Sequence, residues 1–294
     1  MYETARPAVN TLARATSVNP ALRPLRRRFR HYPCYHPAML RLCLGFLAAA
    51  GVSAAAVRAR ALTPGGAAAA TAVGGIIIGL GGPGPAALLL LFFATSSFLS
   101  GSETRDMISA KGKRRDGRQV VANGGVPALA AALGTIPVLQ PPAAAAIAGS
   151  LAAVTSDTWS SEIGRRAQSR ALHVRTRRSV PAGTSGGVTP AGTLGGIAGS
   201  LIIALADARI TGNARRVLPV LMGGLAGNAI DTILGATVQE VRACPSCGIL
   251  TEQRVHRPCG AETSVCGGVA GFDNDLVNLG AAVGGALVAV SLAR

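Results

Sequence analysis

Eight apolar stretches of roughly the length that crosses a lipid bilayer follow one another through most of the chain. A transmembrane helix needs about 20 predominantly apolar residues. The stretches are 38–57, 62–81, 85–100, 119–139, 142–162, 188–208, 216–238 and 275–293. The second and third are short and rich in glycine, which leaves a re-entrant hairpin open there. The pattern predicts an all-α, polytopic integral membrane protein with about 6–8 transmembrane helices, in the cytoplasmic (inner) membrane if the protein is bacterial.

The charge of the chain also fits a membrane protein better than a nucleic-acid-binding protein. Only 14% of the residues are charged, against about 25% in soluble domains. A net charge of +16 would suggest nucleic acid as the partner of a soluble protein. Basic loops beside apolar helices explain the same excess, and aromatic residues, which stack on RNA bases, make up only 3% of the chain. We expect the lipid bilayer as a partner and no nucleic acid; the oligomeric state stays open.

The distribution of basic residues predicts which loops face the cytoplasm. Basic residues concentrate in the loops 101–118, 163–187 and 239–274. If all eight stretches cross the membrane, these loops fall on one side, and their charge assigns that side to the cytoplasm. The apolar stretches and these loops together form a predicted membrane domain over 38–294. Residues 1–37, with seven arginines and one acid, are predicted to be a basic disordered arm; a transit-peptide-like leader and a true start at Met39 are the alternatives.

Acidic residues are scarce, so their positions in the apolar stretches are informative. Asp157 and Glu162 stand near the end of the fifth stretch, and Asp231 stands inside the seventh. On a helix Asp157 shares a face with Ser161, whereas Glu162 lies about 140° away and would face elsewhere unless the helix unwinds. An ionisable residue at membrane depth is a candidate functional group. For the fifth stretch, a polar helix end in the headgroup region is the alternative.

Asp157 and Asp231 are each followed by a threonine, and each apolar stretch follows another that is rich in glycine. This similarity suggests a parallel two-fold repeat that would bring the two Asp-Thr pairs together. Chance is the alternative, because the composition is so biased.

A third acidic cluster, with Asp273 and Asp275, lies at the start of the last stretch. An acidic residue there can simply cap the helix and complement its dipole. Acidic positions at one membrane face also resemble a Mg²⁺ site that substrate phosphates complete.

Basic and glycine-rich segments near these acids are candidates for binding phosphate. The basic candidates are Lys111, Arg114, Arg115, Arg177 and Arg178. The turn Gly183-Thr184-Ser185-Gly186 precedes an apolar stretch and offers backbone N–H groups to a phosphate. It is not a Walker motif, because no Gly-Lys-Ser/Thr follows at the required spacing. A flexible loop with topology-setting charges is the alternative.

Two short cysteine motifs occur in the loop 239–274. Cys244 and Cys247 are separated by two residues, as are His256 and Cys259. This spacing predicts a zinc site with three cysteines and one histidine, with Cys266 as a competing ligand. Four protein ligands leave no open position, so the zinc would be structural. Free thiols are the alternative, since a cytoplasmic loop disfavours disulfides.

Five segments, taken together and in this order, resemble a known family. They are 111–125, 156–164, 183–189, 230–239 and 273–278. They include Lys-Gly-Lys-Arg-Arg-Asp-Gly-Arg-Gln, Ser-Asp-Thr-Trp-Ser-Ser-Glu and Asp-Asn-Asp-Leu-Val-Asn. From the first apolar stretch to the C-terminus the chain is similar to the integral membrane family of transmembrane protein 19, which includes the plant phytyl-phosphate kinase. The resemblance implies that a nucleoside triphosphate phosphorylates a membrane-embedded isoprenoid (phytyl-like) monophosphate. The loop 239–274, here called the cysteine loop, and the arm 1–37 lie outside this resemblance.

Such phosphoryl transfer needs Mg²⁺, cations on the phosphates and alignment more than a nucleophilic side chain. We therefore expect Asp157, Glu162 and Asp231 to hold Mg²⁺, directly or through water. The basic candidates and the glycine-rich turn would hold phosphates, and Asn123 and Asn228 would orient either substrate. A lipid nucleotidyltransferase is an alternative with a similar site. A transporter or flippase of isoprenoid phosphates, the other alternative, should carry carboxylates near the midplane and gates on both sides.

Overall fold

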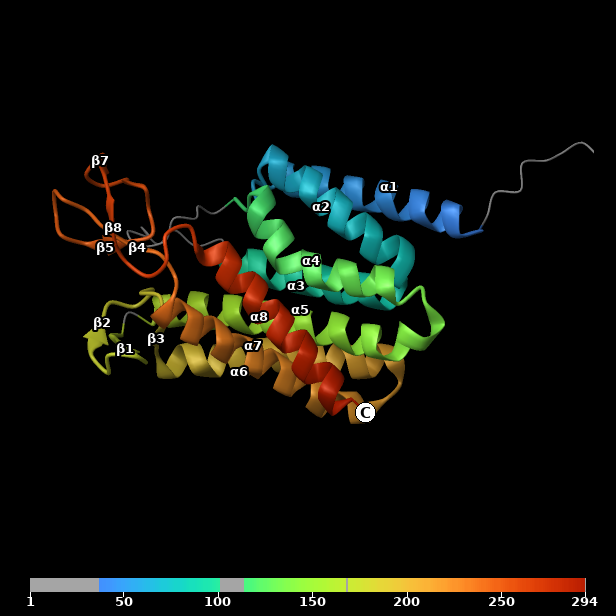
Figure 1. The fold of residues 1–294 in the computed structure, drawn as a ribbon. Coiled ribbons are helices and arrows are strands. Elements are labelled where there is room, and N and C mark those ends of the chain that lie inside the picture. Colours follow the sequence, from blue (N-terminus) through green and yellow to red (C-terminus); the bar gives the residue numbers. More distant parts are fainter. Residues whose placement is uncertain (1–36, 101–113, 168, 294) are drawn as a thin grey trace, which may run out of the picture. The chain divides into compact units, whose positions relative to one another are not determined.

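The computed structural model describes residues 37–100, 114–167 and 169–293, which form eight α-helices and several short strands (Figure 1). The helices are α1 (Pro37–Arg58), α2 (Pro64–Ile76), α3 (Pro83–Ser100), α4 (Gly117–Leu133), α5 (Gln140–Arg166), α6 (Pro190–Thr211), α7 (Val217–Thr237) and α8 (Asn274–Leu292). A π-helical turn, η1 (Ile77–Gly81), extends α2, and the 3-10 turns η2 (Pro137–Leu139) and η3 (Ala214–Arg216) precede α5 and α7. Almost all of the arm expected at 1–37 lies outside the described residues, as does Lys111.

Seven of these described helices are long and apolar enough to cross a membrane. The second, which combines α2 with η1, and the third each supply 18 residues, so this pair has the length of two crossings. The exception is α4, which has 17 residues and contains Pro127. The prediction of an all-α, multi-pass membrane protein is therefore confirmed.

The fourth apolar stretch differs from its prediction, because the helix expected over 119–139 ends at Leu133. Ile136 adopts an extended conformation (φ −86°, ψ 118°) immediately before Pro137. The proline ring disfavours a helical conformation at the residue before it. The chain therefore leaves the helix, turns, and enters α5 through η2.

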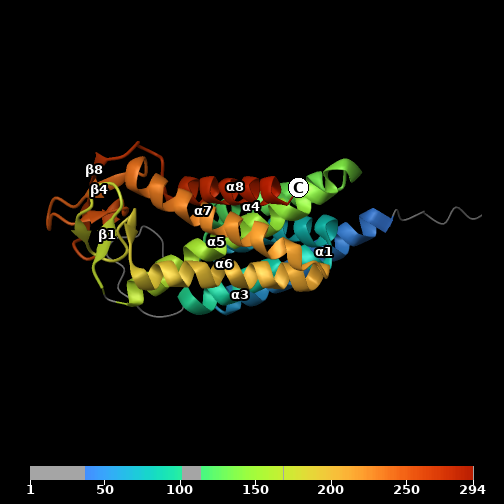
Figure 2. The ribbon, with the colours of Figure 1, turned by 90° about the horizontal axis from the view of Figure 1, so that it is seen from below.

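The helices alternate in direction, so that α2, α4, α6 and α8 all begin at the end that carries the strands (Figures 1 and 2). Each of these four starts is capped by a side chain that accepts a hydrogen bond from a backbone N–H. The caps are Thr63, Asp116, Thr189 and Asp273. Such caps satisfy N–H groups that have no partner inside the helix. The strand end therefore gathers four polar helix starts.

Helix α5 packs against α4, α6, α7 and α8, and glycines allow its backbone to come close to two of them. Gly149 of α5, Gly223 of α7 and Gly285 of α8 meet at one point, here called the glycine junction. A Cβ atom on Gly285 would lie 2.9 Å from the carbonyl oxygens of both Gly149 and Gly223. Any larger residue would force the helices apart, as at small-residue contacts between membrane helices. The junction holds α5, α7 and α8 together in close backbone contact.

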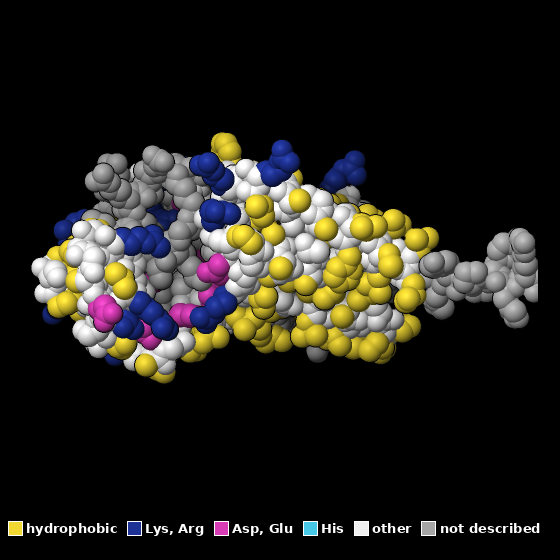
Figure 3. Space-filling model, turned by 90° about the horizontal axis from the view of Figure 1, so that it is seen from above, with side chains coloured by type: hydrophobic (Ala, Val, Ile, Leu, Met, Phe, Trp, Pro, Cys, Tyr) yellow, Lys and Arg dark blue, Asp and Glu magenta, His cyan; other side chains and the backbone are white. Residues whose placement is uncertain are grey.

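The strands belong to the segments that connect α5 to α6 and α7 to α8, and they form three small antiparallel sheets. Their strands are β1 (Ala171–His173), β2 (Ser179–Val180), β3 (Gly187–Val188), β4 (Val241–Ala243), β5 (Leu250–Thr251), β6 (Val255–His256), β7 (Ala261–Glu262) and β8 (Ser264–Gly267). The strand orders are β2-β1-β3, β5-β4-β8 and β6-β7. Hydrophobic side chains cover the helical part of the face in Figure 3, whereas many of the charged side chains visible there gather at the strand end.

Candidate functional site

A polar cavity of about 350 Å³ opens at the strand end, between the ends of α5 and α7, the starts of α6 and α8, and the loops. Ten of the residues predicted for the site line it: Arg115, Asn123, Asp157, Glu162, Gly183, Thr184, Ser185, Gly186, Asn228 and Asp231. Segments far apart in the sequence therefore meet around one space. We call this space the polar cavity.

The carboxyl groups of Asp157 and Asp231 lie next to each other in the lining of the polar cavity. Asp157 also contacts the Ser161 hydroxyl group, as the shared helix face predicts. One oxygen of Asp231, Oδ1, is buried and has no hydrogen-bond partner among the described residues. Two touching carboxylates repel each other unless a proton or a cation neutralises the pair. The pair is therefore chemically suited to a cation.

Glu162 faces the same cavity, although the face of an unbroken helix predicted otherwise. The helix α5 continues to Arg166 without unwinding. Glu162 accepts a hydrogen bond from Ser100 Oγ at 2.9 Å and forms an ion pair with Arg165 at 2.7 Å. The cavity is wide enough to reach around the end of α5, so residues on different sides of this helix line it. The side chain of Glu162 is thus already paired within the protein.

Arg115 is the most buried cation of the site, with 8% of its surface exposed. Its guanidinium donates to Ser97 Oγ at 3.1 Å and lies 5.5 Å from the ring centres of both Phe92 and Phe93. Burial lowers the pKa of Arg115 to about 10, and the nearby Glu162 carboxylate acts in the opposite direction. Arg115 therefore keeps its positive charge at neutral pH.

The glycine-rich turn is positioned by contacts with α7 and with the cysteine loop. Gly183 and Gly186 have positive φ values of 92° and 74°, which favour glycine. A Cβ atom on Gly186 would also lie 2.6 Å from the Cα atom of Ala236. Ser185 Oγ donates to Glu252 Oε1 at 2.8 Å, and Gln239 Nε2 donates to the same oxygen at 2.6 Å.

Several predicted site residues lie elsewhere, because local structure already uses them. The guanidinium of Arg114 donates to the Leu62 carbonyl oxygen at 2.9 and 3.1 Å. Arg177 and Arg178 belong to the connection between β1 and β2, away from the cavity lining. These three arginines are therefore not placed to hold a phosphate in the polar cavity. Lys111 lies outside the described residues.

The third acidic cluster contributes its asparagines to the cavity and not its aspartates. Asp273 caps α8 and forms an ion pair with Arg118 at 2.8 Å, and the Asp275 carboxylate lies 3.8 Å from the same guanidinium. Asn274 and Asn278 line the polar cavity instead. The capping interpretation accounts for Asp273. Neither aspartate lines the polar cavity, so this cluster is not placed to bind a Mg²⁺ ion there.

Sequence reasoning missed several residues that line the cavity. They include Gln119, Arg165, Thr189, Gln239, Glu252, Arg257 and Asn278. Asn278 carried a signal, because an amide stands four residues after Asn274 in an apolar helix. Glu252 and Arg257 carried none, since they come from a loop whose path no periodicity predicts.

A second cavity, of about 430 Å³, lies among α1, α2, α3 and α4 and is almost entirely apolar. Alanines, valines, leucines and the rings of Phe92 and Phe93 line this apolar cavity. Arg115 and Asn123 line both cavities. A polar space and an apolar space therefore adjoin at one buried cation and one amide.

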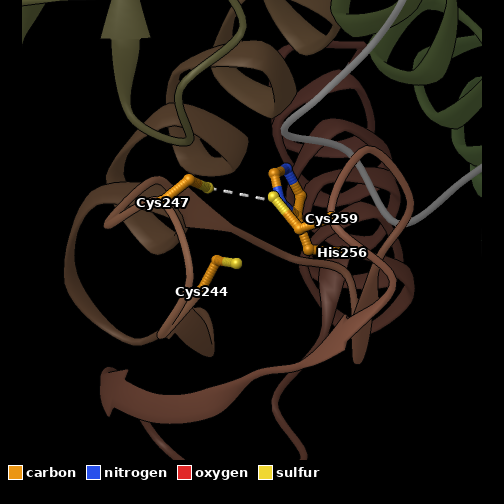
Figure 4. Close-up of side chains that lie close together, drawn as sticks. All are labelled: Cys244, Cys247, His256 and Cys259. Carbon is orange, nitrogen blue, oxygen red and sulfur yellow. Dashed lines mark hydrogen bonds between the residues drawn. The ribbon is translucent and has the colours of Figure 1, made fainter.

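The predicted zinc ligands come together in the cysteine loop (Figure 4). One potential ligand atom from each of Cys244, Cys247, His256 and Cys259 lies within 4.8 Å of the other three. Cys266 is not part of this group, and its sulfur lies 3.5 Å from the Val241 carbonyl oxygen. Zinc binding itself stays a prediction.

Comparisons with known proteins identify the family. The chain is 32% identical over 186 residues to an uncharacterized membrane protein, MJ0933, of Methanocaldococcus jannaschii, an alignment that covers 63% of this chain and 73% of that protein. It is 31% identical over 222 residues to Protein PGR of Arabidopsis thaliana, covering 65% of this chain and 75% of that protein. No solved structure matches. The family model described as integral membrane protein DUF92 matches residues 47–286, and the chain therefore belongs to this family of integral membrane proteins.

Proposed function

We propose that this protein is a prenyl-phosphate kinase, which transfers a phosphoryl group from a nucleoside triphosphate to a membrane-embedded, phytyl-like isoprenoid monophosphate. The observation that carries the proposal is the pair of adjoining cavities, which share Arg115 and Asn123. An isoprenoid phosphate has one charged end and one long apolar tail. The shared wall suits the point where such a molecule changes from charged to apolar. The resemblance to the transmembrane protein 19 family supports the same reaction.

Each cavity has a role in this proposal. The apolar cavity would take the isoprenoid tail, between helices rich in alanine and glycine. Arg115 would bind the acceptor phosphate, because its buried charge stands at the boundary. The glycine-rich turn and Arg257 would face the phosphates of the nucleotide. Phosphates bind well to guanidinium groups and to backbone N–H groups of such turns.

The paired carboxylates fit a Mg²⁺ ion that arrives with the nucleotide. Asp157 and Asp231 would hold it, since their contact needs a positive charge and the Asp231 Oδ1 atom lacks a partner among the described residues. When bound, Mg²⁺ neutralises charge that develops on the phosphoryl oxygens. Glu162 would act indirectly: its carboxylate forms an ion pair with Arg165 and so positions that guanidinium in the lining of the cavity.

The reaction needs no strong base from the protein. The terminal P–O bond of the nucleoside triphosphate breaks while a new P–O bond forms to an oxygen of the acceptor phosphate. The products are the prenyl diphosphate and the nucleoside diphosphate. The acceptor oxygen is already deprotonated near neutral pH, so the side chains mainly need to bind, align and exclude water.

The test is an assay of the purified protein in nanodiscs with prenyl monophosphates and each nucleoside triphosphate. The expected products are a prenyl diphosphate and a nucleoside diphosphate. Release of pyrophosphate with a nucleotidyl lipid would replace the kinase with a nucleotidyltransferase. If no product forms and the protein moves isoprenoid phosphate between the leaflets of a proteoliposome, the kinase proposal is refuted and a flippase takes its place.

A further inference from the structure

Two matching turns build the cysteine loop. In the first, Cys244 and Cys247 are followed by Gly248, whose N–H donates to the Cys244 carbonyl oxygen at 2.8 Å. In the second, His256 and Cys259 are followed by Gly260, whose N–H donates to the His256 carbonyl oxygen, also at 2.8 Å. The two glycines have positive φ values of 72° and 64°. Two unrelated segments thus fold the same way around the four candidate ligands.

Each turn also closes a small hairpin. The first connects β4 to β5, and the second connects β6 to β7. These hairpins have only two or three residues in each strand that pairs, which is too little for independent stability. A link between the two turns would supply what the short strands lack.

The donor atoms converge as metal ligands do. Figure 4 shows the three sulfur atoms and the imidazole around a common space. His256 is fully buried, and its Nδ1 atom lies 3.5 Å from Cys247 Sγ and 3.3 Å from Cys259 Sγ. A tetrahedral ion with Zn–S distances of about 2.3 Å and Zn–N distances of about 2.0 Å would hold S and N about 3.5 Å apart.

We infer that Cys244, Cys247, His256 and Cys259 bind a structural zinc ion that fixes one wall of the polar cavity. Three thiolates and one imidazole in a compact set favour zinc over hard cations such as Mg²⁺. All four positions of a tetrahedral ion are filled by protein atoms, so the ion has no open site for a substrate. The assignment of the zinc ligands does not depend on the reaction proposed above.

The wall in question is formed by Glu252 and Arg257, which line the polar cavity from the cysteine loop. Arg257 stands directly after the ligand His256, and its backbone N–H donates to Gln253 Oε1 at 2.9 Å. Glu252 accepts the hydrogen bonds from Ser185 and Gln239 that connect this loop to the glycine-rich turn and to the residues after α7. Loss of the ion would therefore loosen the wall as well as the loop.

Metal analysis of the full-length protein, purified in detergent without chelator, tests the site directly. We expect about one zinc per chain, because the four ligands make one tetrahedral site. Cys247→Ser and Cys259→Ser should lose it. Cys266→Ser is the matched control, since Cys266 lies in the same loop outside the ligand group, and it should keep the metal. Zinc retained by both ligand variants would overturn the assignment.

A second measurement does not depend on how the variants fold. Wild-type protein stripped of metal should take up Co²⁺ and develop thiolate-to-cobalt charge-transfer absorption. Wild-type protein that neither contains zinc nor takes up Co²⁺ would refute the site. Limited trypsin digestion then tests the wall, because Arg254 is exposed and precedes the ligand hairpin. Cleavage after Arg254 should rise several-fold on metal removal and stay low in Cys266→Ser; unchanged cleavage would refute the structural role.

Discussion

Replacing Asp157 or Asp231 by asparagine tests whether the two carboxyl groups hold a cation or only complete the packing. Each substitution keeps the shape of the side chain and removes one charge from a pair that is in contact. Two unit charges about 4 Å apart interact by about 4 kcal/mol at an effective dielectric constant of about 20. Without a cation this energy is a repulsion, so either variant should be at least as stable as the wild type.

With Mg²⁺ bound, the same carboxylate charge stabilises the ion and, through it, the transition state. A loss of about 4 kcal/mol corresponds to about a thousand-fold fall in rate. We expect Mg²⁺ to raise the melting temperature of the wild type. We expect Asp157→Asn and Asp231→Asn to fold, to show no such rise, and to turn over about a thousand-fold more slowly. The assay is turnover at saturating Mg²⁺ and substrates, with thermal melting in parallel.

Asp207→Asn is the matched control for neutralising a buried acid. Asp207 of α6 is 4% exposed, and its carboxylate binds the Arg216 guanidinium at 2.6 and 3.1 Å, outside the polar cavity. Its loss leaves the partly buried Arg216 guanidinium without its carboxylate, which should lower the melting temperature. Turnover of the folded Asp207→Asn protein should stay unchanged. Near-wild-type turnover in both Asp157→Asn and Asp231→Asn would refute the cation site.

Three further predictions concern the cavities and the loop after α7. Arg115→Ala should raise the KM for the prenyl monophosphate by about 10- to 150-fold, since a hydrogen bond to a charged group contributes about 1.5–3 kcal/mol; an unchanged KM in steady-state kinetics would contradict this. Ala86→Phe, in the apolar cavity, should reduce activity on long-chain more than on short-chain substrates, whereas Ala54→Phe, outside it, should not discriminate. The Gly271 N–H and the Arg242 guanidinium, each 2.6 Å from a Glu240 oxygen, lower the pKa of Glu240 from its ordinary 4.5. This stabilisation is present above pH 4.5 and disappears as the pH falls through the lowered value, so the difference in melting temperature between wild type and Glu240→Gln should shrink in acid.

The helices were predictable because apolar length is a strong signal and membrane helices leave few alternatives. The start of α8 was placed to within one residue, and α5 to within four at either end. The predicted end of α4 was wrong. The run of apolar residues continues past Pro137, but this proline disfavours a helical conformation at the residue before it, so the helix does not continue through it. Hydropathy reports which residues tolerate lipid, and local backbone chemistry decides where a helix stops.

The carboxylates of the site were predictable because an acid in an apolar helix is costly and therefore informative. The basic residues were less so, since Arg114 and Arg115 are neighbours with different partners. Arg114 binds a backbone carbonyl, whereas the buried guanidinium of Arg115 lies 5.5 Å from the centres of two aromatic rings. No pattern in the sequence separates them, because tertiary contacts made by α2 and α3 decide which one turns inward.

The glycine junction sets the depth at which the two carboxylates stand. Asp157 follows Gly149 by eight residues, and Asp231 follows Gly223 by the same number. The two helices run in the same direction from a shared crossing on Gly285, so equal offsets of about 12 Å bring the side chains level. The contact between the glycines therefore fixes the position of both aspartates along their helices. Inserting one residue between Gly223 and Asp231 would turn Asp231 by about 100° and leave Asp157 facing an apolar neighbour, with no change to the cavity lining that α5 supplies.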